Sequence, residues 1–278
     1  MLYWLASYPK SGNTWLRLLL HSYLAGGAAV DINNMALDGW SVNQRALFDE
    51  AIGVSASDLT DEEILTWWPW VLRGWARART EPAYLKTHAQ ERSSDFTLGA
   101  IYLVRDPRDV ALSLARHLNC SIDAAVTIMG TQNQTMSRSR YRLQSHLVQR
   151  WGSWSQNVES WLAPASFPVH VLQYEKMRAD PVAALLELLP ALGFSVNHEN
   201  AKAAAKATAL ETLRKQEASK GFAEAVGPHR FFGDGRIAGW RERLTHAQVS
   251  RIEGDHGQVM ARLGYIDRFT DCRLRSSE

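Results

Sequence analysis

The sequence predicts an α/β fold in which a central, mainly parallel sheet is flanked by helices. The first observation is a set of four short apolar segments with β-forming residues, at 2–7, 83–87, 100–105 and 169–174. The second is that long segments typical of helices separate most of them, as in parallel sheets covered on both faces. The third is the loop at 8–12, which joins the first strand to a helix and has a glycine where a phosphate-binding loop would need one.

The helices are predicted from helix-forming residues and from their end signals. Residues 13–24 form the first helix, which Gly26 and Gly27 end. Pro107 and Pro181 each follow a strand closely and stand at plausible first positions of helices. Further mostly helical stretches are expected at about 60–80, 121–162, 198–217 and 246–263.

A single domain spanning residues 1–278 is expected, with about 266–278 as a C-terminal tail. The chain shows no internal repeat, no low-complexity linker and no break in composition. Its 46% hydrophobic and 22% charged residues are typical of a globular protein. A chain of this length buries about 75% of the surface that its unfolded form exposes, so a full core is available.

The net charge and the number of cysteines indicate which kinds of binding partner and cofactor to expect. A formal net charge of +2 argues against a general nucleic-acid or membrane binder, while it leaves room for a local basic pocket. Cys120 and Cys272 do not amount to a disulfide framework or a metal cluster. The apolar segment 16–25 is too short to span a bilayer. We therefore expect a cytoplasmic protein without stable membrane insertion.

The stretch YPKSGNTW, residues 8–15, has the layout of an anion site. A loop that leaves a strand and opens a helix points free backbone N–H groups at its ligand, and the helix dipole favours an anion there. Gly12 permits close backbone approach, and Lys10 adds a positive charge. The common nucleotide loop GxxxxGK[ST], with its lysine after the last glycine, is absent. Taken alone, the stretch fits either an anion site or a tight turn with an exposed lysine.

The full string resembles the 5′-phosphosulfate loop of the sulfotransferases that use 3′-phosphoadenosine 5′-phosphosulfate (PAPS), the cytosolic family and its bacterial relatives. The resemblance implies that Lys10 contacts the bridging oxygen and the leaving phosphate, and that Trp15 packs on the adenine. It also implies that the phosphosulfate is cradled by Ser11, Gly12, Asn13 and Thr14.

The stretch IYLVRDPRDVALS resembles the 3′-phosphate motif of the same family, an arginine at a strand end and a serine eight residues later. These residues are Arg105 and Ser113. The guanidinium fork suits a phosphate better than an ammonium group does. We expect Asp106, Arg108 and Asp109 to form a solvated turn with local ion pairs.

The stretch YLKTHA, residues 84–89, resembles the K-T-H segment that ends a strand beside the acceptor in this family. The resemblance implies that His88 takes the proton from the acceptor hydroxyl. Imidazole suits this role because its ordinary pKa of about 6.5 lies near the working pH. Lys86 is expected to help hold the non-bridging oxygens of the sulfuryl group.

Weaker matches extend the resemblance over nearly the whole chain. GSWSQNVESWL, residues 152–162, is similar to a core helix whose tryptophans pack. Tyr174 is expected near the adenine, and Thr208 is expected to contact PAPS. The aromatic residue that the family has two positions after this threonine is Leu210 here, which predicts poorer stacking on that side.

The largest departure from the family lies at FFGDGRIAGW. Gly233 and Asp234 stand where an arginine and a lysine normally meet the 3′-phosphate, and an aspartate there would repel it. Gly235 matches the motif. We expect Gly235 and Arg236 to lie at the nucleotide, and either Arg236 or Arg230 substitutes for the missing charges or Asp234 points to solvent.

The resemblance implies that the sulfuryl group of PAPS passes to a hydroxyl of a small-molecule acceptor and that 3′-phosphoadenosine 5′-phosphate (PAP) is released. The acceptor class stays open among phenols, alcohols, lipids and natural products. No metal is expected, since no close cluster of His, Cys and carboxylate ligands is found. The sequence is compatible with a homo-oligomer but does not specify one.

The stretch TWWPWVLRGWARA, residues 66–78, carries four tryptophans. Either it is a helix pair that buries aromatic side chains in the core, or it forms an aromatic wall or gate at the acceptor. Residues 32–45 are expected to belong to the same lid over the acceptor.

Two other classes of function compete with this interpretation. A small-molecule kinase would need a magnesium-binding hydroxyl after a loop lysine and an acidic residue at a strand end, and neither is clear. A non-catalytic nucleotide-binding protein is disfavoured because Lys10, His88, Arg105 and Ser113 occur together.

Overall fold

The computed structural model describes residues 1–35, 43–90, 95–136, 145–225 and 229–267. Half of the segment 32–45 that was predicted to belong to the lid over the acceptor, residues 36–42, lies outside the described residues. So do Cys272 and nearly all of the predicted tail, residues 268–278.

A parallel four-stranded sheet forms the centre of the fold, and all four predicted strands are confirmed. Its strands are β1 (Leu2–Ser7), β2 (Ala83–Thr87), β3 (Thr97–Val104) and β6 (Val169–Gln173), in the order β2-β1-β3-β6. The chain places β2 on one side of β1 and then returns to add β3 on the other side. Because the connections after β1 and β3 diverge, a crevice is expected at the carboxyl ends of these two strands.

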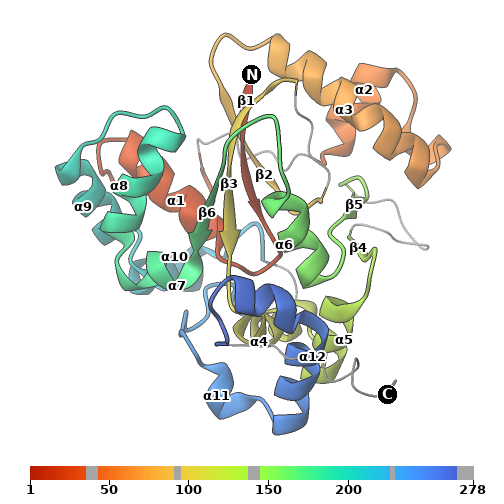
Figure 1. The fold of residues 1–278 in the computed structure, drawn as a ribbon. Helices are drawn as coiled ribbons and strands as arrows, with labels where there is room; N and C mark the ends of the chain where they lie inside the picture. Colours follow the sequence, from red (N-terminus) through yellow and green to blue (C-terminus); the bar gives the residue numbers. More distant parts are fainter. Residues whose placement is uncertain (36–42, 91–94, 137–144, 226–228, 268–278) are drawn as a thin grey trace.

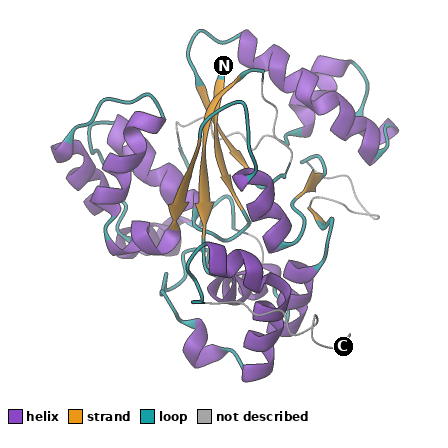
Figure 2. Cartoon of the chain, viewed as in Figure 1, coloured by secondary structure: helices purple, strands orange, loops and turns teal. Residues whose placement is uncertain are grey.

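Helices cover both faces of the sheet (Figure 1, Figure 2). On one face lie α1 (Asn13–Leu24), α8 (Pro181–Ala191) and α9 (His198–Ala207), packed on Leu5 and Leu103. On the other face lie α5 (Ile122–Gly130), α6 (Trp154–Leu162) and α12 (His246–Arg262), packed on Trp4, Tyr102 and Val104. This alternation follows from the two-residue period of a strand.

The remaining elements frame the sheet. They are α2 (Arg45–Ile52), a 3-10 turn (Ala56–Asp58), α3 (Asp61–Arg77), α4 (Pro107–Leu118), α7 (Tyr174–Ala179), α10 (Leu210–Lys220), α11 (Trp240–Arg243), and the short antiparallel pair β4 (Thr135–Met136) and β5 (Gln149–Arg150). Figure 1 shows α4 beyond the carboxyl ends of the strands.

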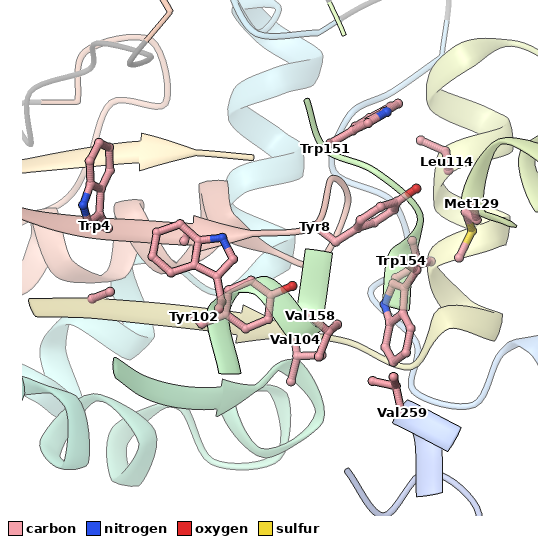
Figure 3. Close-up of a cluster of buried hydrophobic side chains, with 14 of the residues drawn as sticks. Trp4, Tyr8, Tyr102, Val104, Leu114, Met129, Trp151, Trp154, Val158 and Val259 are labelled. Atoms are coloured by element: carbon pink, nitrogen blue, oxygen red, sulfur yellow. The ribbon is translucent and has the colours of Figure 1, made fainter. Parts of the chain in front are cut away.

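Aromatic rings fill the core between the sheet and α6 (Figure 3). Tyr8 stacks on Trp151 with ring centroids 5.7 Å apart, and Tyr102 stacks on Trp161 at 6.0 Å. Trp154 is fully buried beside them. The predicted packing of the tryptophans in residues 152–162 is therefore confirmed.

Two predicted helical stretches are interrupted. Within 121–162, β4 and β5 separate α5 from α6, and the carbonyl of Gln134 accepts the N–H of Trp151 at 2.9 Å. Within 198–217, α9 ends at Ala207 and α10 begins at Leu210. Between them, the carbonyl of Thr208 accepts the indole N–H of Trp15 at 3.0 Å. In both places a partner distant in sequence takes a backbone group that a continuous helix would use.

The expected solvated turn at Asp106, Arg108 and Asp109 is wrong, because all three side chains are buried. Arg108 pairs with Asp106 at 2.7 Å and with Glu253 of α12 at 2.8 Å. Asp109 accepts the backbone N–H groups of Ala238 and Trp240 at 2.8 and 2.9 Å. Glu253, Ala238 and Trp240 lie more than a hundred residues from these side chains in the sequence. The buried charges therefore fix α12 and the segment leading into α11 to α4.

The four tryptophans of α3 divide between two environments. Trp68 and Trp75 pack against hydrophobic clusters, as the core interpretation predicted. Trp67 and Trp70 are 48% and 61% exposed. No helix of the described residues is long and apolar enough to cross a membrane.

A stability prediction follows from Asn157, which is completely buried in α6. Its carboxamide accepts the Tyr102 hydroxyl at 2.8 Å and donates to the carbonyls of His88 and Trp151 at 2.9 and 2.8 Å. We expect Asn157→Leu to lower the free energy of unfolding by about 2 to 4 kcal/mol, because it leaves buried polar groups unpaired. Urea denaturation measures this, and Asn200→Leu on α9 is the control. A loss below about 0.5 kcal/mol would contradict the assignment.

Candidate active site

A cavity of about 1010 Å³ opens where β1 and β3 end. Loop 8–12, α4 and the segment 231–236 contribute to its walls. The predicted site residues that line it are Lys10, Gly12, Asn13, Thr14, Trp15, Lys86, His88, Arg105, Ser113, Tyr174, Gly235 and Arg236. Two predicted residues do not line it, Ser11 and Thr208. The resemblance therefore brought together residues from five distant stretches.

The backbone of the loop is shaped for an anion. Lys10 has a φ of 67° and Gly12 a φ of 104°, both in the left-handed region. A Cβ on Gly12 would lie 2.6 Å from the Tyr174 ring, so only glycine fits there. Gly12 is the N-cap of α1, and no side chain caps this end within the described residues. The first N–H groups of α1 thus keep their capacity to bind an anion.

The polar side chains of the loop differ in their contacts within the protein. The Asn13 amide donates to the Leu5 carbonyl at 2.8 Å and so ties α1 to β1. Its Oδ1 has no hydrogen-bond partner among the described residues, and its backbone N–H lies at the start of α1. Ser11 is fully buried, and its hydroxyl has no hydrogen-bond partner among the described residues. Thr14 approaches the carboxylate of Glu224 at 3.5 Å.

Trp15 and Tyr174 form an aromatic corner of the cavity. Their rings meet edge to face with centroids 6.1 Å apart, and the Tyr174 hydroxyl donates to the Gly235 carbonyl at 3.2 Å. The Thr208 hydroxyl points away, since it donates to the Ala204 carbonyl at 2.8 Å. Thr208 instead positions Trp15 through its own carbonyl, which a motif match does not reveal. Leu210 lines the cavity near this corner.

His88 is held in one orientation. Its Nδ1–H donates to the Ser7 carbonyl at 2.7 Å, which leaves Nε2 as the nitrogen with a lone pair. Burial, followed by the charges of Lys86 and Lys10, lowers the pKa of His88 to about 3. The imidazole is therefore neutral at physiological pH, and its pKa without a bound nucleotide lies well below the value of about 6.5 expected for a base. An anion bound beside Lys86 and Lys10 raises this pKa by offsetting their charges.

The cavity concentrates positive charge. Burial, with smaller effects from Arg116, Lys86 and Arg105, lowers the pKa of Lys10 to about 7. The Lys10 ammonium lies 4.0 Å from the centre of the Phe231 ring and makes no ion pair among the described residues. A buried cation in this state gains most from an incoming anion.

Sequence reasoning missed an ion-pair cluster formed by Glu224. Its carboxylate contacts Arg17 at 2.8 Å and Lys86 at 3.1 Å. Burial alone would raise the pKa of Glu224, but Lys86 and Arg17 lower it to about 2. Arg17 lies one helical turn after Thr14, a spacing that the sequence displays. Glu224 has no local signal, since it lies 210 residues from Thr14.

The departure at Gly233 and Asp234 has a structural explanation. Arg105 donates to the carbonyls of Lys10 and Arg236 at 3.4 and 3.1 Å, and its Nε has no partner among the described residues. A Cβ at Gly233 would overlap the guanidinium of Arg116, which lines the cavity from α4. The missing side chain at position 233 therefore makes room for a cation from another element.

Asp234 is neutralised by neighbouring arginines. It contacts Arg243 at 2.8 Å and Arg236 at 3.8 Å. The guanidinium of Arg236 is half-exposed and also contacts Glu242 at 3.0 Å. Arg116 lies three residues after Ser113 on the same helix face, a signal that could have identified it.

Among the described residues, no group of three or more His, Cys, Asp or Glu side chains is placed to hold a metal ion. The expectation of a metal-independent reaction stays a prediction.

Sequence comparison defines the class of protein. A profile of the family described as "Sulfotransferase domain" matches residues 3–264, and the chain belongs to this family. Cytosolic sulfotransferase 13 of Arabidopsis thaliana is 24% identical over 270 residues, which cover 90% of this chain and 74% of that protein. Sulfotransferase 1A1 of Bos taurus is 24% identical over 268 residues, which cover 92% and 82%.

Solved structures share the fold. Mouse sulfotransferase SULT7A1 complexed with PAP superimposes with a TM-score of 0.58 at 18% identity, over 95% of this chain and 85% of that chain. Retinol dehydratase in complex with androsterone and the inactive cofactor PAP gives 0.57 at 18% identity, over 93% and 80%. The protein is a PAPS-dependent sulfotransferase, and its reaction is sulfuryl transfer.

A pH-dependence prediction follows from Lys10. In the protein without a nucleotide, the pKa of Lys10 is about 7. A bound anionic nucleotide raises this pKa, so PAP binding takes up protons. Binding is then strongest below pH 7 and weakens as the pH rises through the higher pKa of the complex. Calorimetry at pH 8 in buffers of different ionisation enthalpy measures the uptake. Lys10→Met is expected to abolish it, and equal uptake by this variant would contradict the assignment.

Glu224 gives a second prediction. Its carboxylate pairs with Arg17 and Lys86, which a bound phosphosulfate would otherwise contact. We expect Glu224→Gln to bind PAPS about tenfold more tightly, a change of about 1.4 kcal/mol, with a smaller gain for PAP. Calorimetry compares the two nucleotides, and Glu199→Gln, which removes an exposed ion pair on α9, is the control. Unchanged or weaker PAPS binding would show that Glu224 does not compete with the nucleotide.

Proposed function

We propose that the enzyme transfers the sulfuryl group of PAPS to a hydroxyl of a small-molecule acceptor and releases PAP. The observation that carries this proposal is His88, a neutral imidazole fixed through Nδ1 in a cavity with Lys10 and Lys86. A neutral base beside cations suits a reaction in which a hydroxyl loses its proton while an anionic group moves. PAPS, when bound, supplies the activated sulfuryl group.

The loop residues are assigned to the 5′ end of the nucleotide. The N–H groups at the start of α1, from Gly12 onward, bind the phosphosulfate, and Lys10 neutralises the charge that develops on the leaving phosphate. Lys86 holds the non-bridging oxygens of the transferred group. His88 accepts the acceptor proton at Nε2, while the Ser7 carbonyl stabilises the resulting imidazolium through Nδ1.

The other end of the nucleotide is assigned to α4 and the aromatic corner. Arg105, Ser113 and Arg116 take the 3′-phosphate, so that Arg116 replaces the basic residues absent at Gly233 and Asp234. Trp15 and Tyr174 contact the adenine.

Three further expectations stay predictions: that residues 1–278 form one domain, that the protein is cytoplasmic, and that it is compatible with a homo-oligomer. The names of several relatives, such as Cytosolic sulfotransferase 13, favour the cytoplasm. Relatives of known fold bind small molecules, namely androsterone and retinol in retinol dehydratase.

Calorimetry with PAP, AMP, and ADP plus magnesium tests the nucleotide site. Arg105→Ala and Arg116→Ala are each expected to weaken PAP binding at least tenfold and to leave AMP binding nearly unchanged, because AMP lacks the 3′-phosphate. Arg262→Ala, at an exposed position of α12, is the control. Preference for ADP plus magnesium would overturn the proposal in favour of a kinase.

Activity measurements on His88→Ala separate catalysis from binding. Removing a general base is expected to lower turnover about 10²- to 10⁴-fold with unchanged PAP affinity. Turnover equal to that of the native enzyme would remove His88 from the mechanism.

A further inference from the structure

The acceptor end of the cavity differs in chemistry from the nucleotide end. Beyond His88, the described wall residues are Asn43, Gln44, Met136, His146, Gln149 and Trp151. Four of these six side chains carry an amide or an imidazole. None of the four tryptophans of α3 lines the cavity, so the aromatic wall that residues 66–78 offered as an alternative is absent from the described part of the site.

Two side chains of this end are buried hydrogen-bond donors that lack partners. Gln149 and Trp151 are only 4% and 5% exposed. Neither Gln149 Nε2 nor Trp151 Nε1 has a hydrogen-bond partner among the described residues. Two positions apart on an extended segment, they face the same side, and both line the cavity. Buried donors of this kind need acceptor atoms, and a ligand that packs against these two side chains would supply them.

The two donors lie close to the proposed base. The N–H of Gln90 donates to the carbonyl of Arg150 at 2.9 Å, so the chain after β2 runs beside β5. The amide of Asn157 donates to the carbonyls of both His88 and Trp151. The segments that carry His88, Gln149 and Trp151 are therefore adjacent, and all three side chains line the same cavity.

None of these six wall residues carries a charge at physiological pH. Asn43, Gln44 and Gln149 are amides, and burial lowers the pKa of His146, which keeps its ring neutral at physiological pH. The nearest cations on the acceptor side, Arg17 and Lys86, are paired with Glu224. A charged group buried against amides alone would lose its hydration without an ionic partner.

Nonpolar surface is limited to one face of this end. Met136 offers a thioether, and Trp151 offers the part of its indole that Tyr8 does not cover. Such a combination of a few apolar contacts with several amides suits a molecule that alternates C–H and hydroxyl groups.

We propose that the acceptor is an uncharged polyhydroxylated compound, of the sugar or cyclic polyol class, whose oxygens next to the reacting hydroxyl accept hydrogen bonds from Gln149 and Trp151. This inference rests on the proposed function and narrows its acceptor class. Phenols and apolar alcohols would leave both buried donors unpaired, and such sites discriminate strongly against ligands that lack the matching groups.

Acceptor binding and sulfation are measured on one panel. Methyl glucopyranoside, myo-inositol and sucrose represent uncharged polyols, methyl glucopyranosiduronate adds a charge, and 4-nitrophenol and cyclohexanol lack the extra oxygens. Saturation-transfer NMR records binding to the PAP-loaded and the nucleotide-free protein, and PAP release from PAPS records turnover. At least one uncharged polyol is expected to bind and to exceed 4-nitrophenol about a hundredfold in kcat/KM.

Two variants test the donors directly. Gln149→Leu and Trp151→Phe, which keeps a ring against Tyr8, are each expected to lower kcat/KM for the polyol about tenfold, with PAP affinity unchanged. Gln132→Leu, at an exposed position before β4, is the matched control. If no uncharged polyol binds, if 4-nitrophenol is preferred, or if neither variant lowers polyol turnover, the inference is overturned.

The outcomes also separate this inference from the proposed function. A protein that binds PAP and sulfates phenols but not polyols keeps the proposed function and loses the polyol assignment. A protein that does not bind PAP loses both.

Discussion

Positive charge held away from water is the constraint on which this structure depends. Lys10, Arg105 and Arg116 face one cavity, and Lys10 is desolvated enough for its pKa to fall to about 7. The free energy needed to assemble such a cluster is offset partly within the chain, where the Glu224 carboxylate contacts Arg17 and Lys86. A nucleotide with anionic groups at both its 5′ and 3′ ends offsets more of it, since each new ion pair forms where water competes least. Affinity and transition-state stabilisation therefore come from the same preorganised charges.

The fold holds these charges in place through groups that are themselves neutral. The crevice exists because the connections diverge after β1 and β3. The Asn13 amide binds α1 to β1, and the carbonyls of Lys10 and Arg236 fix the guanidinium of Arg105. Asn157 links the base residue His88 to the segment that ends in Trp151. A change in any of these contacts would move charged side chains without altering their number, so geometry rather than composition sets the activity.

The sequence predicted the parts that local pattern determines. The four strands and the loop at 8–12 follow from apolar periodicity and from a short motif, and both need only neighbouring residues. Glu224 and the burial of Asp106 and Arg108 escaped prediction, because they depend on contacts between distant elements. Arg116 was missed although its spacing from Ser113 is visible in the sequence. Thr208 shows a further limit. The motif assigns it to PAPS, but the structure shows that its carbonyl accepts the indole N–H of Trp15 and that its hydroxyl donates to the Ala204 carbonyl.

A crystal structure of the protein with PAP tests the central claim most directly. The account predicts the 5′-phosphate on the backbone N–H groups at the start of α1, with Lys10 in contact, and the 3′-phosphate between Arg105, Ser113 and Arg116. It also predicts that Asp234 keeps its contact with Arg243. A nucleotide bound with its phosphates away from these groups, or with the 3′-phosphate in solvent, would contradict the claim that this cationic cavity is the nucleotide site.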